Sequence, residues 1–350
     1  MSSCLSRPGP DHFVGFNIFD GTGNPEVLAD QLMAIFHGIY QDQGIYTSNY
    51  LRAAIQTLAS VPGQTLVEVV PFLTDPGFRG RIVRQISDPI LTSIWQRFES
   101  EGPATQMRLV QPAIHRVQPL LLRSSVRLTL GQADNQLDMR RVLRERRILI
   151  VSVPKGHLGE ETSALFGSLV FARMWQAAMA RSRPERHPYF LHIDEAQNFL
   201  HMPLNLGDVL AEARKYQLGL VLAHQHGGQM PPQLRAAIQA NTRTKIAFAA
   251  SAEDSHAVAR ELGPPIEPGD ALALSKFEIL LQATIDDQTC PPATARTLPL
   301  MPVTSSSARI RAASRDTWAT HRDVVDAAIL SRQQEPEQPR QRSARGWEVV

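Results

Sequence analysis

The stretch that decides the fold is Tyr189-Phe190-Leu191-His192-Ile193-Asp194-Glu195. A mostly apolar run of this length is typical of a buried strand, and two adjacent carboxylates follow it directly. Asp194 and Glu195 are therefore expected at the carboxyl end of a strand. Ligands of open α/β sheets bind at that edge. The alternative is that both carboxylates only cap the next helix, expected at 196–200.

Four more apolar runs surround this one, and helical stretches separate them. Short continuous apolar runs predict strands that are apolar on both faces, and helices between them predict a mostly parallel sheet covered on both sides. The fold class expected is therefore α/β. The five predicted strands are Ile148–Val153, Tyr189–Ile193, Leu218–Ala223, Ile246–Ala250 and Ile279–Ala283.

The remaining chain is expected to be largely helical. Asn24 followed by Pro25 is a helix-start signal, and a second helix is expected from Ser48 to Ala59. The β-branched run from Thr65 to Leu73 predicts a strand. The expected division is a flexible lead-in (1–12), the N-terminal remainder of the α/β core (13–75), a helical subdomain (76–147), the main α/β core (148–300) and a mostly disordered tail (301–350).

The composition excludes several classes of protein. The 350 residues carry 36 lysines and arginines against 34 aspartates and glutamates, and a net charge of +2 excludes a simple polycationic coat protein for nucleic acid. Two cysteines, Cys4 and Cys290, cannot form a disulfide framework, so a reducing, cytoplasmic setting is expected. No run approaches the roughly 18 apolar residues of a transmembrane helix.

A second polar group follows the next predicted strand. Gln225 comes just after the run Leu218–Ala223, so it is expected at the same sheet edge as Asp194 and Glu195. In nucleoside-triphosphate hydrolases an Asp at this place holds the magnesium shell, a following Glu polarises the attacking water, and a glutamine orients water or senses the γ-phosphate. Arg214, on the preceding helix, could project towards a neighbouring subunit as an arginine finger. The alternative is that Arg214 only complements the helix dipole.

Two patterns resemble cofactor or metal sites but lack residues or spacings that such sites require. Gly21-Thr22-Gly23-Asn24-Pro25-Glu26 imitates the start of a dinucleotide fingerprint, but Glu26 replaces its third glycine. His192, His224 and His226 could meet at one sheet edge, but no metal-ligand spacing supports them. Core or loop roles are expected for these histidines.

Nucleic-acid contact is suggested by one cluster of arginines. A solvated helix face explains the cluster equally well. No aromatic residue is interleaved with the basic clusters, so bound DNA is expected to be held through its backbone, with little sequence preference. The cluster consists of Arg140, Arg141, Arg144, Arg146 and Arg147.

The motifs together resemble those of the HerA/FtsK superfamily. They are most similar to the conjugative coupling proteins of TraG/TraD type and their type IV secretion relatives, over about residues 13–285. The motifs are Phe16-Asn17-Ile18-Phe19-Asp20, Ser87-Asp88-Pro89 with Trp95, the segment 148–159, Asp194-Glu195, Arg214-Lys215-Tyr216, Gln225 and the segment 241–248.

The resemblance implies a RecA-like P-loop ATPase, usually hexameric, that moves DNA through a central pore, with ATP and Mg2+ as cofactors. It implies that Asp194 belongs to the magnesium shell, Glu195 is the catalytic glutamate, Gln225 is the sensor and Arg214 is the candidate finger. It also implies DNA and a homo-oligomer as partners, and a membrane-bound secretion complex at the cytoplasmic face of the inner membrane.

The chain departs from this pattern in one respect. No Gly-x-x-x-x-Gly-Lys-Ser/Thr loop occurs in it, and none of its four lysines lies in such a loop. Lys155 follows a predicted strand, but its spacing and the missing Ser/Thr exclude a P-loop. Tight ATP binding by this chain alone is therefore not expected. Two interpretations remain: a part of a motor that lacks its N-terminal P-loop segment, or a non-hydrolysing structural subunit that assembles with an intact motor.

Overall fold

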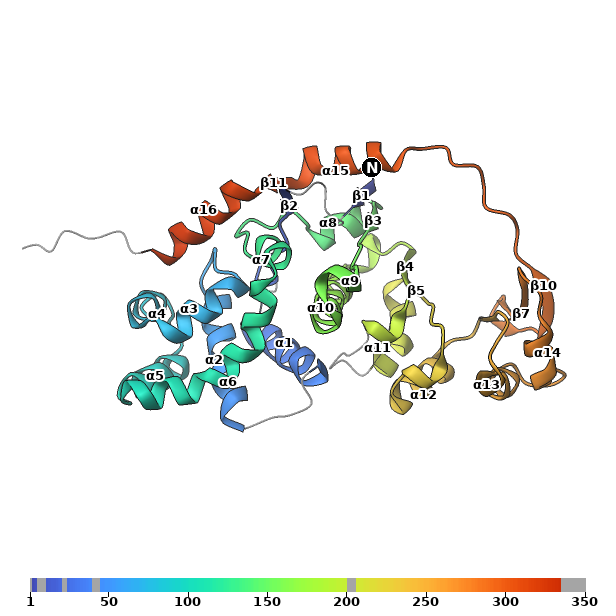
Figure 1. Cartoon of the computed structure of the whole chain (residues 1–350), viewed down its shortest axis with the longest axis horizontal. Helices are drawn as coiled ribbons and strands as arrows, with labels where there is room; N and C mark the ends of the chain where they lie inside the picture. The colour runs from blue at the N-terminus through green and yellow to red at the C-terminus, as the bar shows by residue number, and fades with distance from the viewer. Residues whose placement is uncertain (1, 5–10, 21–23, 40–44, 200–205, 335–350) are drawn as a thin grey trace, which may run out of the picture.

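A computed structural model gives the fold of the chain (Figure 1). The structure describes residues 2–4, 11–20, 24–39, 45–199 and 206–334. Over these ranges the chain is a mixed α/β protein, in which a helical layer lies beside several small sheets. No helix within the described ranges is both long and apolar enough to span a membrane.

The first helix begins where the sequence predicts it. The Asn24 side chain accepts a hydrogen bond from the Glu26 backbone N–H at 2.8 Å, so it caps helix α1 (Pro25–Ile39). Helix α2 (Ile45–Ala59) packs along α1 and begins ahead of the predicted Ser48.

The prediction of a strand from Thr65 to Leu73 is wrong. This segment forms a 3-10 turn (Leu66–Glu68) followed by helix α3 (Val69–Thr74). The Glu68 carboxylate accepts from the Thr65 backbone N–H at 2.8 Å and from the Thr65 hydroxyl at 2.6 Å. This capping box starts a helical turn and overrides the β preference of the branched residues.

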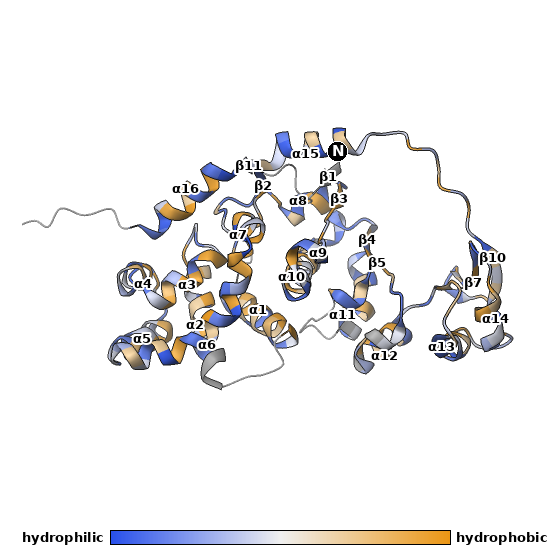
Figure 2. Cartoon of the chain, in the orientation of Figure 1, coloured by the Kyte–Doolittle hydropathy of each residue, from blue (hydrophilic) through white to orange (hydrophobic). Residues whose placement is uncertain are grey.

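The segment from 76 to 147 is helical and contains no strand, as predicted. Asp75 and Asp88 each cap a helix that has Pro at its first position. Figure 2 shows that helices of this layer carry both apolar and polar faces, as amphipathic helices do. The helices are α4 (Pro76–Val83), α5 (Pro89–Glu99), α6 (Pro103–Leu122), α7 (Ser124–Leu130) and α8 (Met139–Arg144).

Strands form at all five predicted positions, but they do not make one parallel sheet. In the described part of the chain, β4 and β5 form a parallel pair, β3 pairs in parallel with β1 (Ser2–Cys4), and β6, β7 and β10 (Ala293–Arg296) are antiparallel. Apolar runs indicate burial but not strand direction, which explains the error. The five strands are β3 (Ile148–Ile150), β4 (Tyr189–Ile193), β5 (Leu218–Leu222), β6 (Lys245–Ala247) and β7 (Glu278–Gln282).

The expectation that helices cover both faces is also wrong for β3, β4 and β5. One face packs on the main core through residues such as Leu191 and Leu220. The opposite face is open, since Ile148 is 64% exposed and Phe190 is 63% exposed. Helices that connect or follow the strands are α9 (Lys155–Leu158), α10 (Glu160–Met179), α11 (Leu206–Ala213), α12 (Pro232–Asn241), α13 (Ala252–Leu262) and α14 (Pro268–Ala273).

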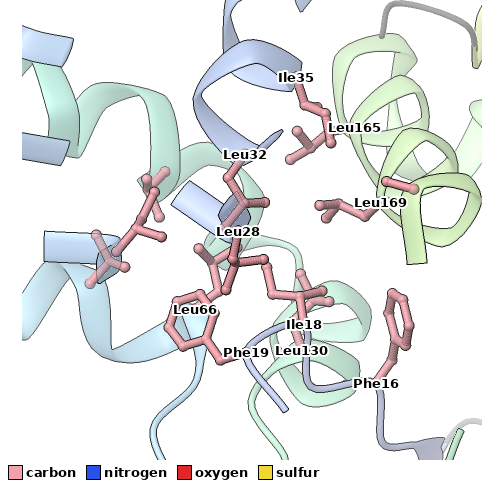
Figure 3. Packing of buried hydrophobic residues seen from close by; sticks show 14 of the residues in the cluster. Phe16, Ile18, Phe19, Leu28, Leu32, Ile35, Leu66, Leu130, Leu165 and Leu169 are labelled. Atoms are coloured by element: carbon pink, nitrogen blue, oxygen red, sulfur yellow. The ribbon is translucent and has the colours of Figure 1, made fainter. Parts of the chain in front are cut away.

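The main core lies between α1, α7 and α10, and the segment Phe16–Phe19 runs through it (Figure 3). Asn17 is buried within this segment. Its side-chain amide donates to the Gln64 carbonyl at 3.1 Å and to the Ala133 carbonyl at 3.0 Å. Because a buried amide is costly unless it is hydrogen-bonded, these contacts fix the path of the segment.

The tail is not disordered over the part that the structure describes. Helix α15 (Ser307–Trp318), strand β11 (Ala319–His321) and helix α16 (Arg322–Gln333) return across the helical layer (Figure 1). Strand β11 pairs antiparallel with β2 (His12–Val14), and Arg332 contacts the buried Glu68. Local composition does not reveal such long-range contacts. Residues 335–350 lie outside the described residues, as do 1 and 5–10 of the predicted lead-in.

Candidate functional site

The carboxyl ends of β4 and β5 lie side by side. Ile193 stands opposite Leu222 in the parallel register. Backbone hydrogen bonds continue past the strands, because the Ala223 N–H donates to the Ile193 carbonyl at 2.9 Å and the Ala196 N–H donates to the Ala223 carbonyl at 2.8 Å. The polar residues that follow the two strands therefore share one edge, as predicted.

Glu195 is held at this edge by two amides. Its Oε2 accepts from Gln197 Nε2 at 2.6 Å, and its Oε1 accepts from Gln225 Nε2. Its backbone is left-handed, with φ 51° and ψ 47°, which costs a non-glycine residue about 1–2 kcal/mol. Strained residues of this kind cluster at functional sites. The structure thus brings the predicted pair Glu195 and Gln225 together.

Asp194 lies exposed beside Glu195. Its Oδ1 accepts a hydrogen bond from the Glu195 backbone N–H at 3.0 Å. Two adjacent carboxylates fit Mg2+, which binds proteins through one or two carboxylates and takes its other ligands from water and phosphate oxygens. The phosphate side fits less well, because the sequence has no loop of backbone N–H groups of the P-loop kind. Asp194 and Glu195 are therefore the described residues that could hold Mg2+ at this edge.

Lys155 is a cation near this edge that the sequence reasoning considered only as a P-loop lysine and set aside. Its Nζ donates to Asn198 Oδ1 and lies 3.5 Å from Glu160 Oε1. The Asn198 backbone N–H in turn donates to the Glu195 carbonyl at 2.9 Å. The available signal was that Lys155 follows a predicted strand, whose end belongs at the edge where Asp194 lies. Comparison with the P-loop pattern alone could not find it.

The structure does not bring Arg214 to the carboxylates. Arg214 lies in the turn before β5, at the opposite end of that strand from Gln225. Its Nη2 pairs with Asp287 Oδ2 at 2.9 Å, and Arg243 Nη1 pairs with Asp287 Oδ1 at 3.0 Å. Hydrogen bonding from Arg214, and then the charge of Arg243, lowers the pKa of Asp287. Arg214 is therefore separated from Glu195 and Gln225 by the length of β5.

The other polar motifs are used mainly to stabilise local structure. The Asn241 side chain donates to the Ala237 carbonyl at 2.9 Å, and Lys245 Nζ donates to the Glu261 carbonyl at 3.3 Å. His226 Nδ1 lies 3.1 Å from Asp254 Oδ2. Among the residues that the structure describes, no group of three or more His, Cys, Asp or Glu side chains could hold a metal ion.

Two members of the arginine cluster are also committed to internal contacts. Arg141 Nε and Arg147 Nε donate to the two oxygens of Glu145 at 2.8 Å and 2.6 Å. Hydrogen bonds from Arg141 and then Arg147 lower the pKa of Glu145. Both guanidinium groups also lie over the Trp318 ring of α15, at 5.2 Å and 4.8 Å from its centroid. These contacts favour a structural role for Arg141 and Arg147.

Fold and site define a mixed α/β protein that places two carboxylates and an amide at one strand edge, the location of ligand sites in open α/β sheets. Comparison with solved structures gives a more specific result. The chain is similar to the plasmid coupling protein TrwB in complex with ADP and Mg2+, with a TM-score of 0.63 and 13% identity, over 88% of this chain and 76% of that chain.

Further structures of the same protein agree. The unbound bacterial conjugative coupling protein TrwBdeltaN70 matches with a TM-score of 0.61 and 12% identity, over 88% of this chain and 75% of that one. The complex of TrwB with a non-hydrolysable GTP analogue matches with a TM-score of 0.61 and 14% identity, over 88% and 76%. No protein-family model and no curated protein matches the sequence. The likeness lies in the fold, and it confirms the resemblance to coupling proteins of TraG/TraD type.

Proposed function

We propose that the chain is part of a DNA-translocating ATPase that resembles the conjugative coupling proteins. The observation that carries the proposal is the hydrogen bond between Gln225 and Glu195, which joins the ends of two parallel strands. A carboxylate held by an amide from the neighbouring strand suits a group that orients and deprotonates a water molecule. The TrwB fold, determined in complex with ADP and Mg2+, supports the assignment.

Each residue of the site has its own role in this proposal. Glu195 accepts the proton of the attacking water, and Gln225 fixes the Glu195 carboxylate and senses the γ-phosphate. Asp194 holds the water shell of Mg2+, which supplies charge compensation to the phosphates when it is bound. Arg214 belongs to a neighbouring subunit's site in a homo-oligomer, expected to be a hexamer.

The site is complete only when a phosphate-binding loop is added to it. The sequence contains no such loop, so ATP binding requires one from another polypeptide segment. DNA is the partner that the assembly moves, contacted through its backbone. We place the assembly at the cytoplasmic face of the inner membrane, in contact with a membrane-bound secretion complex.

Substitution of Glu195 tests the proposal. The chain is joined to a segment that carries a Gly-x-x-x-x-Gly-Lys-Ser/Thr loop, and ATP hydrolysis is measured with and without DNA. Glu195→Gln should lower DNA-stimulated hydrolysis by roughly 100-fold or more while ATP binding persists, because loss of a general base costs at least that factor. Glu253→Gln, an exposed glutamate on α13, is the matched control and should have no effect. A joined protein that binds neither ATP nor DNA would refute the proposal.

The absence of the loop from the sequence favours a second candidate function. In it the chain is a non-hydrolysing subunit that keeps the fold and assembles with an intact motor. Glu195→Gln would then leave DNA transfer in the host unchanged. A clear transfer defect from this one substitution rules against the second candidate.

A further inference from the structure

A basic pocket lies at the amino ends of β4 and β5, away from the carboxylates. Its cavity of about 420 Å³ is lined by Arg183, Arg186, Lys215 and Gln217. The two arginines belong to the turn before β4, and Lys215 and Gln217 belong to the turn before β5. The five residues of β4 span roughly 16 Å, so this pocket and the Asp194 edge are separate sites.

The pocket is held together by the arginine at its centre. Arg186 Nε donates to the Arg181 carbonyl at 3.1 Å, and Arg186 Nη1 donates to the Lys215 carbonyl at 3.2 Å. Its guanidinium lies 4.8 Å from the centroid of the Tyr216 ring, and Lys215 Nζ lies 5.3 Å from the same centroid. The two turns are therefore fixed relative to each other before any ligand binds. The expectation that no aromatic residue lies among the basic clusters is wrong for Tyr216.

The charge of the pocket is not compensated within the described chain. No carboxylate of the described residues lies within 4.0 Å of the charged groups of Arg183, Arg186 or Lys215. The one acid in these turns, Glu185, uses its Oε2 to accept from the Ser182 backbone and hydroxyl. Burial, and then repulsion from Arg186, lowers the pKa of the neighbouring Arg181. Three cations held together without an ion-pair partner form a positive patch that attracts an anionic ligand.

We infer that this pocket binds the phosphodiester backbone of a nucleic acid. Arginine and lysine are the residues that contact nucleic-acid phosphates, and arginine does so with a preformed planar fork. The recess is open to solvent and joins the two turns, so an extended chain of phosphates can cross it. A strand of nucleic acid repeats its phosphates, so it can satisfy cations from both turns at once.

The inferred contacts are all to backbone phosphates. Phosphate contacts position a protein on nucleic acid but carry no sequence information. Binding at this pocket is therefore sequence-independent and strongly dependent on salt. The inference rests on the proposed function to the extent that DNA is the substrate, and it adds where the chain holds that substrate.

The test uses the full chain and labelled single-stranded DNA of about 16 nucleotides, the upper end of typical site sizes. Binding is measured by fluorescence anisotropy over a series of salt concentrations. The variant Arg183→Ala/Lys215→Ala removes two exposed cations and leaves Arg186, which ties the turns together. The control Arg309→Ala/Arg311→Ala removes the same charge from the exposed surface of α15.

The pocket variant should bind at least about tenfold more weakly, since each lost phosphate contact removes a charged hydrogen bond. The slope of log K against log salt should fall by about 1.4, which is 0.7 for each of two released contacts. The control variant should keep most of the wild-type affinity for the DNA. Thermal unfolding should place both variants at the wild-type midpoint.

The outcomes separate this inference from the proposed function. If the wild type binds DNA and the pocket variant binds equally well with an unchanged slope, the pocket is not the site, and the proposed function stands. If pocket and control variants lose affinity equally, only total charge matters, and the inference is wrong. If the wild type does not bind DNA, the inference fails, and the loop-joined protein decides the proposed function. If binding depends on the pocket but the loop-completed protein shows no DNA-stimulated hydrolysis, only the proposed function fails.

Discussion

Helix α16 docks onto the helical layer through the buried side chains of Val325 and Ile329 and through one buried ion pair, which makes Arg332→Met an informative substitution. Arg332 Nη2 lies 3.1 Å from Glu68 Oε1 and Arg332 Nε lies 3.2 Å from it. The Glu68 side chain is 0% exposed and the Arg332 side chain is 17% exposed. Arg332 also donates to the Gly131 carbonyl. Methionine keeps the aliphatic stem of the side chain but leaves the carboxylate without its cation.

The expected loss in the free energy of unfolding depends on the hydrogen bonds that Glu68 retains after the substitution. Removing one partner of a fully buried pair costs about 3–5 kcal/mol, but Thr65 still donates two hydrogen bonds to this carboxylate, so we expect a loss of about 2–3 kcal/mol in the free energy of unfolding. The urea midpoint of unfolding, followed by tryptophan fluorescence, measures this loss. Arg311→Met, on the exposed side of α15, is the control and should change the free energy by less than about 0.5 kcal/mol.

The pH dependence gives a second readout with a defined sign. Burial raises the pKa of Glu68 above its ordinary 4.5, although Arg332 and Thr65 lower it in part. The folded state therefore holds a proton that the unfolded state loses, so this group makes stability fall as pH rises from 4.5 through the folded pKa. Loss of Arg332 raises the folded pKa further. The Arg332→Met penalty should thus be largest at neutral pH and shrink towards pH 4.5.

A double-mutant cycle with Glu68→Gln isolates the contribution of the ion pair to the free energy of unfolding. Glutamine can still accept a hydrogen bond from Thr65, and it needs no cation, so Arg332→Met should cost much less in the Glu68→Gln background. An equal penalty in both backgrounds would refute the ion-pair reasoning. So would a penalty that does not change with pH.

Two further substitutions test the packing. Trp95→Phe removes the donor of a 2.9 Å hydrogen bond to the buried Thr57 hydroxyl and should cost about 1–3 kcal/mol in urea unfolding; no measurable loss would contradict this contact. Phe190→Ser acts on the open sheet face and should change stability by less than about 0.5 kcal/mol while reducing aggregation seen by light scattering. A large loss of stability would mean that this face is covered.

The sequence predicted elements whose signals are local. Asn24 with Pro25 marked the start of α1, and the apolar runs marked the positions of five strands. The error at Thr65 arose because β-branched residues outweighed a capping box that was also visible in the sequence, Thr65 with Glu68. The arrangement of the strands and the docking of α16 could not be predicted, because both depend on contacts between residues far apart in the chain.

The sequence predicted the candidate site in part, as it predicted the fold in part. Glu195 and Gln225 meet because parallel strand ends share an edge, a rule that needs only the two strands. Lys155, the first residue of α9, reaches this edge through Asn198, which lies in the 3-10 turn after β4. The two residues are 43 positions apart, and no spacing rule contains this contact. Arg214 was predicted as an arginine finger on the helix before Leu218–Ala223. Its pairing with Asp287 joins residues that are 73 positions apart in the chain, so no local signal could predict it.

The two ends of the β4–β5 pair carry opposite charges, and in the proposed function this separation has a physical reason. A nucleotide with its magnesium ion requires carboxylates to hold the metal shell, whereas a nucleic-acid backbone is repelled by them. If both ligands met the same edge, Asp194 and Glu195 would oppose the polymer, and the arginines would compete with Mg2+ for the phosphates. Parallel pairing places the residues that follow both strands at one end and those that precede them at the other. Two short strands are thus enough to keep an acidic site and a basic pocket roughly 16 Å apart on one rigid unit.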